Sequence, residues 1–150
     1  MANEAQAKRF TFTETALAAG VKPKALRWWL DKGQVHLDAE DEREGTGWRR
    51  FSVVDAIRIA LIGLLVGYCV PVEHSSEIAE DLIRKKLGLL MTYKNTPFDA
   101  VRTALMTAAF AVWPEGGSWG YGEPADDQEH FIFINMQGLV DRVFENLGLE

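Results

Sequence analysis

Residues 10–33 read FTFTETALAAGVKPKALRWWLDKG, and they contain the start and stop signals of two short helices. Thr13 is a suitable N-cap residue for a first helix over residues 14–19, because a threonine side chain can accept a hydrogen bond from a free backbone N–H of the first turn. Gly20 is a suitable stop, since glycine readily adopts the left-handed conformation that ends helices. The residues expected on the buried face are Ala16, Leu17 and Ala19.

A second helix is predicted from Pro23 to the residues just before Gly33. Proline is favoured at the first position of a helix, and Leu26 and Trp29 follow at the spacing of a buried face, with Ala25 beside them. Two short helices joined by a glycine-containing turn are typical of a helix-turn-helix unit.

The segment after Gly33 predicts a wing, meaning two short strands around an exposed loop. QVHL alternates polar and apolar residues, DAEDEREGTG is polar, and WRRF closes the segment. Ser52 is then the expected cap of a helix over residues 53–67, with a buried stripe of Ile57, Leu61, Leu64 and Leu65. A further helix over residues 75–90 follows the break at Pro71.

The second half begins with TYKNTPF, residues 92–98, a polar stretch with a proline that suggests a domain boundary. Apolar residues then recur at intervals of 3, 4, 3 and 4, which predicts a helix over residues 98–112 that pairs two copies of the chain. The proposed dimerisation residues are Phe98, Val101, Leu105, Ala108 and Val112.

HFIFIN, residues 130–135, is typical of a buried strand, and the chain resumes helical spacing at residues 136–148. The predicted fold is therefore mainly α. It comprises a winged helix-turn-helix domain over residues 9–90 and a small α+β domain over residues 91–150. The second domain is expected to serve in dimerisation or in binding a partner or effector.

The charge of the 150-residue chain is unevenly distributed around a net value of −6. Residues 1–37 hold six basic and three acidic residues, or +3, whereas residues 76–150 hold six basic and twelve acidic residues, or −6. Because phosphates are bound mainly by lysine and arginine, an anionic partner is expected to meet the first half. The acidic second half is expected to suit a protein partner.

Several classes of protein are not expected. Cys69 is the single cysteine, so an internal disulfide and a multi-cysteine metal site are excluded, and His36, His74 and His130 lack ligand spacing. No cofactor is therefore expected. Neither a signal peptide nor a membrane span is expected, because residues 1–10 contain no apolar run and the longest run, residues 60–66, is short, and a cytoplasmic location is expected.

The separated motifs TALAAGV, ALRWWLDKG and GWRRFSVVDAIRIALI occur in an order that resembles the N-terminal winged-helix domain of MerR-family transcription regulators. Residues 26–29 stand where members of that family read LRYY, and residues 47–51 replace the GYR and final aromatic that close the wing. Asp55 falls where the long helix of the family carries an aspartate. The resemblance covers roughly residues 10–90 and implies a homodimer on double-stranded DNA.

The resemblance also implies which residues contact DNA. The second helix would enter the major groove with Lys24 and Arg27 nearest the base edges or the adjoining phosphates, and Lys22 would reach a phosphate. Arg49 and Arg50 of the wing would bind the flanking backbone. Trp28 would donate its indole N–H to a phosphate oxygen. The contrasting interpretation is that Trp28 and Trp29 are both buried between helix and wing.

Two other functions compete with regulation of transcription. The winged helix could serve as an adaptor whose acidic wing and tail bind a basic protein, or as a phage-type architectural DNA-binding protein such as an excisionase or packaging subunit. An enzyme is not expected, because the densest titratable run, residues 126–130, lies in a glycine-rich segment without a phosphate cradle, nucleophile motif or metal spacing.

Overall fold

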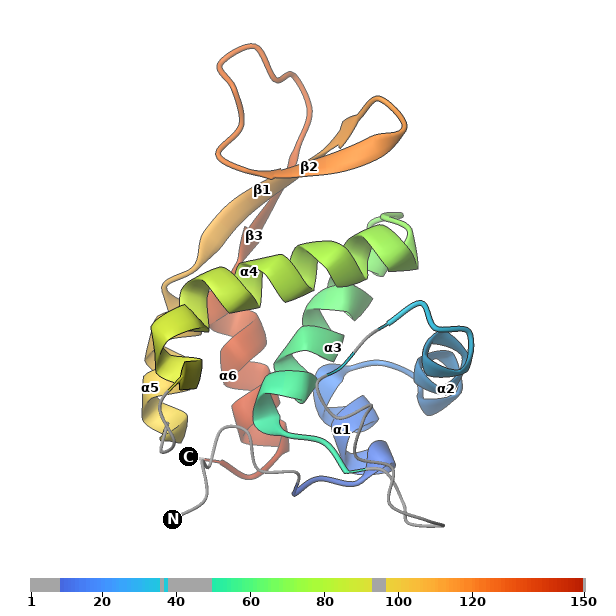
Figure 1. Cartoon of the computed structure of the whole chain (residues 1–150), viewed down its shortest axis with the longest axis vertical. Coiled ribbons are helices and arrows are strands. Elements are labelled where there is room, and N and C mark those ends of the chain that lie inside the picture. The colour runs from blue at the N-terminus through green and yellow to red at the C-terminus, as the bar shows by residue number, and fades with distance from the viewer. Residues whose placement is uncertain (1–8, 36, 38–49, 93–96, 150) are drawn as a thin grey trace.

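The computed structural model describes residues 9–35, 37, 50–92 and 97–149, and these residues are mostly helical with a small antiparallel sheet (Figure 1). The helices are α1 (Phe12–Ala19), α2 (Pro23–Asp31), α3 (Val53–Gly67), α4 (Val72–Thr92), α5 (Phe98–Met106) and α6 (Met136–Asn146). The strands are β1 (Ala109–Glu115), β2 (Ser118–Gly122) and β3 (Ile132–Asn135).

Helix α1 begins two residues earlier than predicted. Its N-cap is Thr11, whose side chain accepts a hydrogen bond from the Glu14 backbone N–H at 3.1 Å, so the assignment of Thr13 as cap was wrong. Leu17 was also wrongly expected in the core, for it is 64% exposed. The buried face contains Thr15, Ala16 and Ala19, a spacing of three and four residues that turns Leu17 outward.

The turn between α1 and α2 consists of residues 20–22, and Gly20 adopts the left-handed conformation with φ of 75°. Pro23 is the first residue of α2, as predicted, and Leu26 and Trp29 are buried. The turn packs against α3 through Val21. A Cβ atom added to Gly63 would lie 2.6 Å from Val21 Cγ2, so glycine at this position lets the turn approach the helix.

Helix α3 is the central element and has the predicted bounds. Ser52 and Asp55 form a capping box, in which the Ser52 backbone N–H donates to Asp55 Oδ2 at 2.9 Å and the Asp55 N–H donates to Ser52 Oγ at 3.1 Å. Every residue from Val53 to Ile62 is buried, and Leu64, which was expected in the buried stripe, is half-buried. Helices α1, α4 and α6 all contact α3.

Most of the predicted wing lies outside the described residues, including His36 and residues 38–49. At its end, Phe51 pairs with Phe10 in an antiparallel bridge, and the Phe51 N–H donates to the Phe10 carbonyl at 2.9 Å. The segment that leads into α3 is thereby tied to the segment that leads into α1.

The helix predicted over residues 98–112 was wrong beyond Met106. Helix α5 ends there, and residues 109–115 form β1, because FAVW is a run of aromatic and β-branched residues that favours a strand. Four of the five predicted dimerisation residues are buried inside the chain's own core, and Phe98 is half-buried against Phe144. The buried four are Val101, Leu105, Ala108 and Val112. They therefore stabilise the monomer and present no surface to a second copy.

The sheet has the order β2-β1-β3 with antiparallel pairing, and it stands beyond α4 at one end of the molecule (Figure 1). Strand β3 was expected to be buried, and this was wrong, since only Ile134 of its four residues is buried. An edge strand packs one face on the core and leaves the alternate side chains outside. Tyr121 of β2 anchors the sheet to α4 by accepting a hydrogen bond from Lys85 Nζ at 3.2 Å.

Helix α6 joins the two halves of the chain. It contacts α1 and α3 as well as α5, and Arg102 of α5 forms an ion pair with Asp141 of α6 at 2.8 Å. The buried apolar residues of the described segments form one cluster that includes residues from Phe10 to Phe144. The predicted boundary near residue 90 therefore does not separate two hydrophobic cores.

Among the described residues, no helix is both long and apolar enough to cross a membrane. The same residues contain no group of three or more histidine, cysteine, aspartate or glutamate side chains suited to a metal ion.

Candidate nucleic-acid interface

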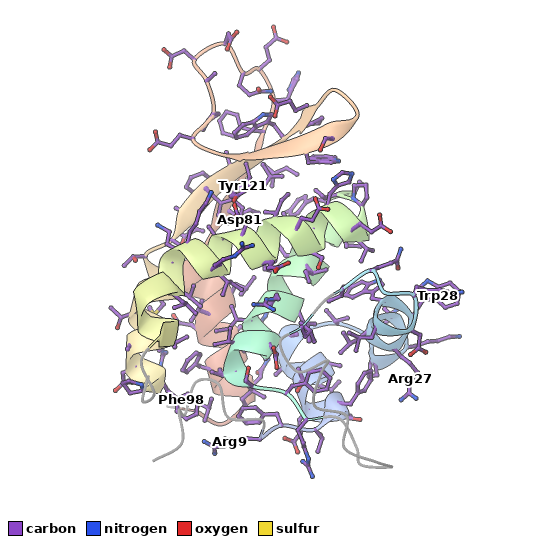
Figure 2. All side chains as sticks on the ribbon, viewed as in Figure 1. Arg9, Arg27, Trp28, Asp81, Phe98 and Tyr121 are labelled. Carbon is purple, nitrogen blue, oxygen red and sulfur yellow. The ribbon has the colours of Figure 1, made fainter. Side chains whose placement is uncertain are left out.

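The exposed side of α2 brings together four of the six residues predicted to contact DNA. Lys22, Lys24, Arg27 and Trp28 are exposed and line one open hollow of about 650 Å³, together with Ala25, Trp29 and Asp31. Figure 2 shows Arg27 and Trp28 projecting away from the rest of the molecule. A surface with this composition can contact phosphates through its cations and through the indole N–H.

The two tryptophans of α2 have different environments. Trp28 is 59% exposed and Trp29 is 8% exposed, so Trp29 contributes to the core while Trp28 lies on the surface. Successive helical residues point about 100° apart, so with Leu26 and Trp29 directed into the core the ring of Trp28 points away from it. The interpretation in which both rings are buried is therefore wrong.

Arg27 is held in place by an aromatic residue from the preceding helix. Its guanidinium carbon lies 5.1 Å from the centre of the Phe12 ring, and Phe12 packs edge-on against Phe51 with ring centres 6.0 Å apart. A cation over an aromatic face is stabilised by the ring quadrupole and keeps its N–H donors free at the rim. The contact thus favours one orientation of the arginine side chain in the free protein.

Lys32 adds a further cation to this surface, next to Trp28. Its Nζ lies 4.7 Å from the centre of the Trp28 ring. The spacing of four residues places Lys32 and Trp28 on the same side of the helix, and this spacing was visible in the sequence. Phe12 was also missed, because its contact joins two helices whose relative placement the sequence did not specify.

The charge of this part of the chain is positive. Residues 9–33 contain five basic residues and two acidic ones, Glu14 and Asp31, which gives +3. The five basic residues are Arg9, Lys22, Lys24, Arg27 and Lys32. Arg50 is also exposed, whereas Arg49 lies outside the described residues.

Arg9 is directed towards the other half of the chain. Its guanidinium carbon lies 5.5 Å from the centre of the Phe10 ring and 5.4 Å from that of Phe98, and Figure 2 shows Arg9 and Phe98 together at the end of the molecule away from the sheet. This arginine links α5 to the segment before α1, so it is a structural contact.

Comparison with known proteins does not assign the chain to a family. No protein-family model matches the sequence, and no curated protein matches it. The geometry of α1 and α2 and the side chains on the exposed side of α2 are therefore the basis of the functional proposal.

Proposed function

We propose that the protein is a sequence-specific DNA-binding transcription regulator of the MerR-like winged-helix type. In this proposal α2 is the recognition helix and lies in the major groove, with Lys24 and Arg27 towards the base edges and Lys22 and Trp28 on phosphates. The observation that carries the proposal is the common position of these four side chains around one hollow on an exposed helix.

The arrangement of Arg27 supports base reading in particular. Arginine recognises guanine by donating two hydrogen bonds to O6 and N7, which requires a defined orientation of the guanidinium group. The contact with Phe12 supplies a defined orientation in the free protein. An exposed lysine has no comparable constraint, which suits Lys22 to phosphates and Lys24 to adaptable contacts with base edges or the adjoining phosphates.

The complete binding unit in this proposal is a homodimer. A single recognition helix reads few base pairs, and two related copies would bind the two halves of a palindromic site. Arg49 and Arg50 would contact the backbone beside each half-site as part of the wing. The pairing surface must differ from the five residues first suggested, because four of them are core residues.

Fluorescence anisotropy of a labelled DNA duplex under salt titration tests this proposal. Binding through several phosphates should weaken steeply as salt rises, with a logarithmic slope near −0.9 for each phosphate contact. Arg27→Ala should weaken binding by about 1 to 3 kcal/mol, and Lys22→Ala should reduce the salt slope by about one contact.

Lys86→Ala provides a matched control. Lys86 is exposed on α4, so its substitution removes the same charge as Lys22→Ala but at a distance from α2. It should leave affinity nearly unchanged. Equal losses for Lys22→Ala and Lys86→Ala would mean that the charge of the whole molecule, and not α2, determines binding, and the assignment of α2 would fail.

A further inference from the structure

The sheet has an outer face, turned away from the core, that carries exposed aromatic side chains. Phe110 pairs with Ile134 and Val112 with Ile132 on the core side, so the alternate pair Ala111 and Phe133 lies on the outer side. Phe133 is 64% exposed, and Phe131, which immediately precedes β3, is 47% exposed. Exposed rings of this size next to one another are typical of interaction surfaces.

Small residues of β1 and β2 lie next to Phe133 in the sheet. Ala111 has Gly122 as its partner on β2 and Phe133 as its partner on β3, and Trp113 is paired with Gly120. A Cβ atom added to Gly120 would lie 2.6 Å from the indole nitrogen of Trp113, so the Trp113 ring lies over this glycine. Ala111 itself is only 1% exposed, so the side chains around it cover this part of the face, and the exposed ring next to it is that of Phe133.

Strand β3 has a free edge. The order β2-β1-β3 leaves β3 paired on one side only among the described residues, and the exposed aromatic residues lie on or next to it. An edge strand offers backbone N–H and C=O groups to an added strand, and side chains of that strand would then alternate between the two faces of the sheet.

The charge of the sheet and its loop identifies the chemistry of the partner. Residues 109–135 contain no lysine or arginine and five acidic residues, all of them exposed. These are Glu115, Glu123, Asp126, Asp127 and Glu129. DNA would be repelled here, and so would the same acidic surface of a second copy. Arginine and lysine side chains pair with carboxylates and stack on aromatic rings.

We propose that a basic, extended segment of another protein adds to the free edge of β3. Its cationic side chains lie over Phe133 and against the carboxylates of the loop between β2 and β3, which are Glu123, Asp126, Asp127 and Glu129. This surface lies in the sheet and its function is independent of DNA binding by α2. A protein with both activities could bring such a partner to a DNA site.

A blocked, fluorescent octapeptide of alternating arginine and valine is a suitable probe for the full-length protein. It should bind, and nuclear magnetic resonance of the labelled protein should place the largest shifts at residues 131–135 and at the Trp113 indole. An octapeptide of alternating glutamate and valine should not bind. The arginine-valine octapeptide methylated at every backbone nitrogen should bind at least about tenfold more weakly, because it has no N–H to donate to β3.

Matched variants separate this surface from the rest of the molecule. Phe133→Ser should weaken peptide binding by about tenfold or more, as removal of a central aromatic contact does. Leu17→Ser is the control, since Leu17 is equally exposed but lies on α1, and it should have little effect. Asp126→Asn combined with Asp127→Asn should weaken binding more than Asp99→Asn on α5, whereas Arg27→Ala should leave peptide binding unchanged.

Three results would overturn the proposal. One is failure of the arginine-valine peptide to bind the folded protein. Another is equal binding of the glutamate-valine peptide, which would show that apolar contact alone determines binding. The last is sedimentation showing a dimer that Phe133→Ser dissociates, which would assign the face to a second copy of this chain. Loss of DNA binding in Arg27→Ala with retained peptide binding would support the two surfaces separately.

Discussion

Trp28 and Trp29 are adjacent in the sequence but contribute differently to the molecule. Trp29 lies in the core with Leu26, while Trp28 is on the surface and has the ammonium group of Lys32 against its ring. The sequence predicted this division from the spacing between Leu26 and Trp29. It did not predict the cation on Trp28, whose position depends on a side-chain conformation.

Trp29→Ala should lower the free energy of unfolding by about 3 to 5 kcal/mol, because truncation of a buried aromatic residue removes burial and leaves a cavity. Trp28→Ala should change it by less than about 0.5 kcal/mol, as is usual for an exposed side chain, and should mainly weaken DNA binding. Urea denaturation measures both variants. Similar losses of stability would contradict the assignment of Trp28 to the surface.

Gly63→Ala should destabilise the protein by about 1 to 3 kcal/mol, because the new methyl group collides with Val21 in the turn between α1 and α2. Adding Val21→Ala to this variant should recover part of the loss. Thermal or urea unfolding of the single and double variants gives the coupling between the two sites.

Gly88→Ala is the control for this pair, since a Cβ atom at Gly88 of α4 would meet nothing within 4 Å. Alanine is favoured over glycine in a helix by up to about 1 kcal/mol, so this variant should be neutral or more stable. Equal behaviour of Gly63→Ala and Gly88→Ala would show that Val21 does not pack closely on α3.

Helix α2 begins without a side-chain cap, because Lys22 occupies the N-cap position and makes no capping hydrogen bond. A serine or threonine there would satisfy a free backbone N–H of the first turn. The residue found is instead one of the cations around the hollow of α2. At this position a capping residue would stabilise the helix, whereas the lysine that is present supplies positive charge to the proposed interface.

Lys22→Ser should raise the free energy of unfolding by about 1 kcal/mol and weaken DNA binding. Lys22→Ala removes the charge without adding a cap, so it should weaken binding to a similar extent at nearly unchanged stability. The two quantities are measured by urea denaturation and by anisotropy with labelled DNA. A serine variant that binds DNA as well as the unsubstituted protein would remove Lys22 from the interface.

Elements with strong terminal signals were predictable from the sequence, and those set by packing were not. Ser52 predicted the start of α3, and the structure shows that Asp55 completes a capping box with it. The end of α5 was missed, because the spacing of Phe98, Val101 and Leu105 is helical and Ala108 continues it by coincidence. The strand that follows is defined by pairing with residues 118–122 and 132–135, which are distant in the sequence.

At the scale of the whole molecule, the residues that the structure describes share one continuous core, in which α6 contacts α1 and α3 as well as α5. The sequence suggested two domains because a polar, proline-containing stretch precedes α5. Such composition marks a loop but gives no information about which elements pack across it. The residues of the exposed side of α2 could be predicted individually, whereas their arrangement around Phe12 required the fold.

Leu105→Ala should destabilise the entire chain by about 2 to 5 kcal/mol, since Leu105 is fully buried in the shared core. Helix content measured by circular dichroism and tryptophan fluorescence should be lost together in one transition, at a lower urea concentration than without the substitution. Two separate transitions would contradict a single cooperative unit.

Selection of bound fragments from a random DNA pool, at two salt concentrations and with Arg27→Ala in parallel, tests the proposed role of α2 most directly. We expect a palindromic sequence to be enriched by the unsubstituted protein and lost from the Arg27→Ala selection. A pool without enrichment at either salt concentration, obtained with folded protein, would contradict sequence-specific DNA binding by α2.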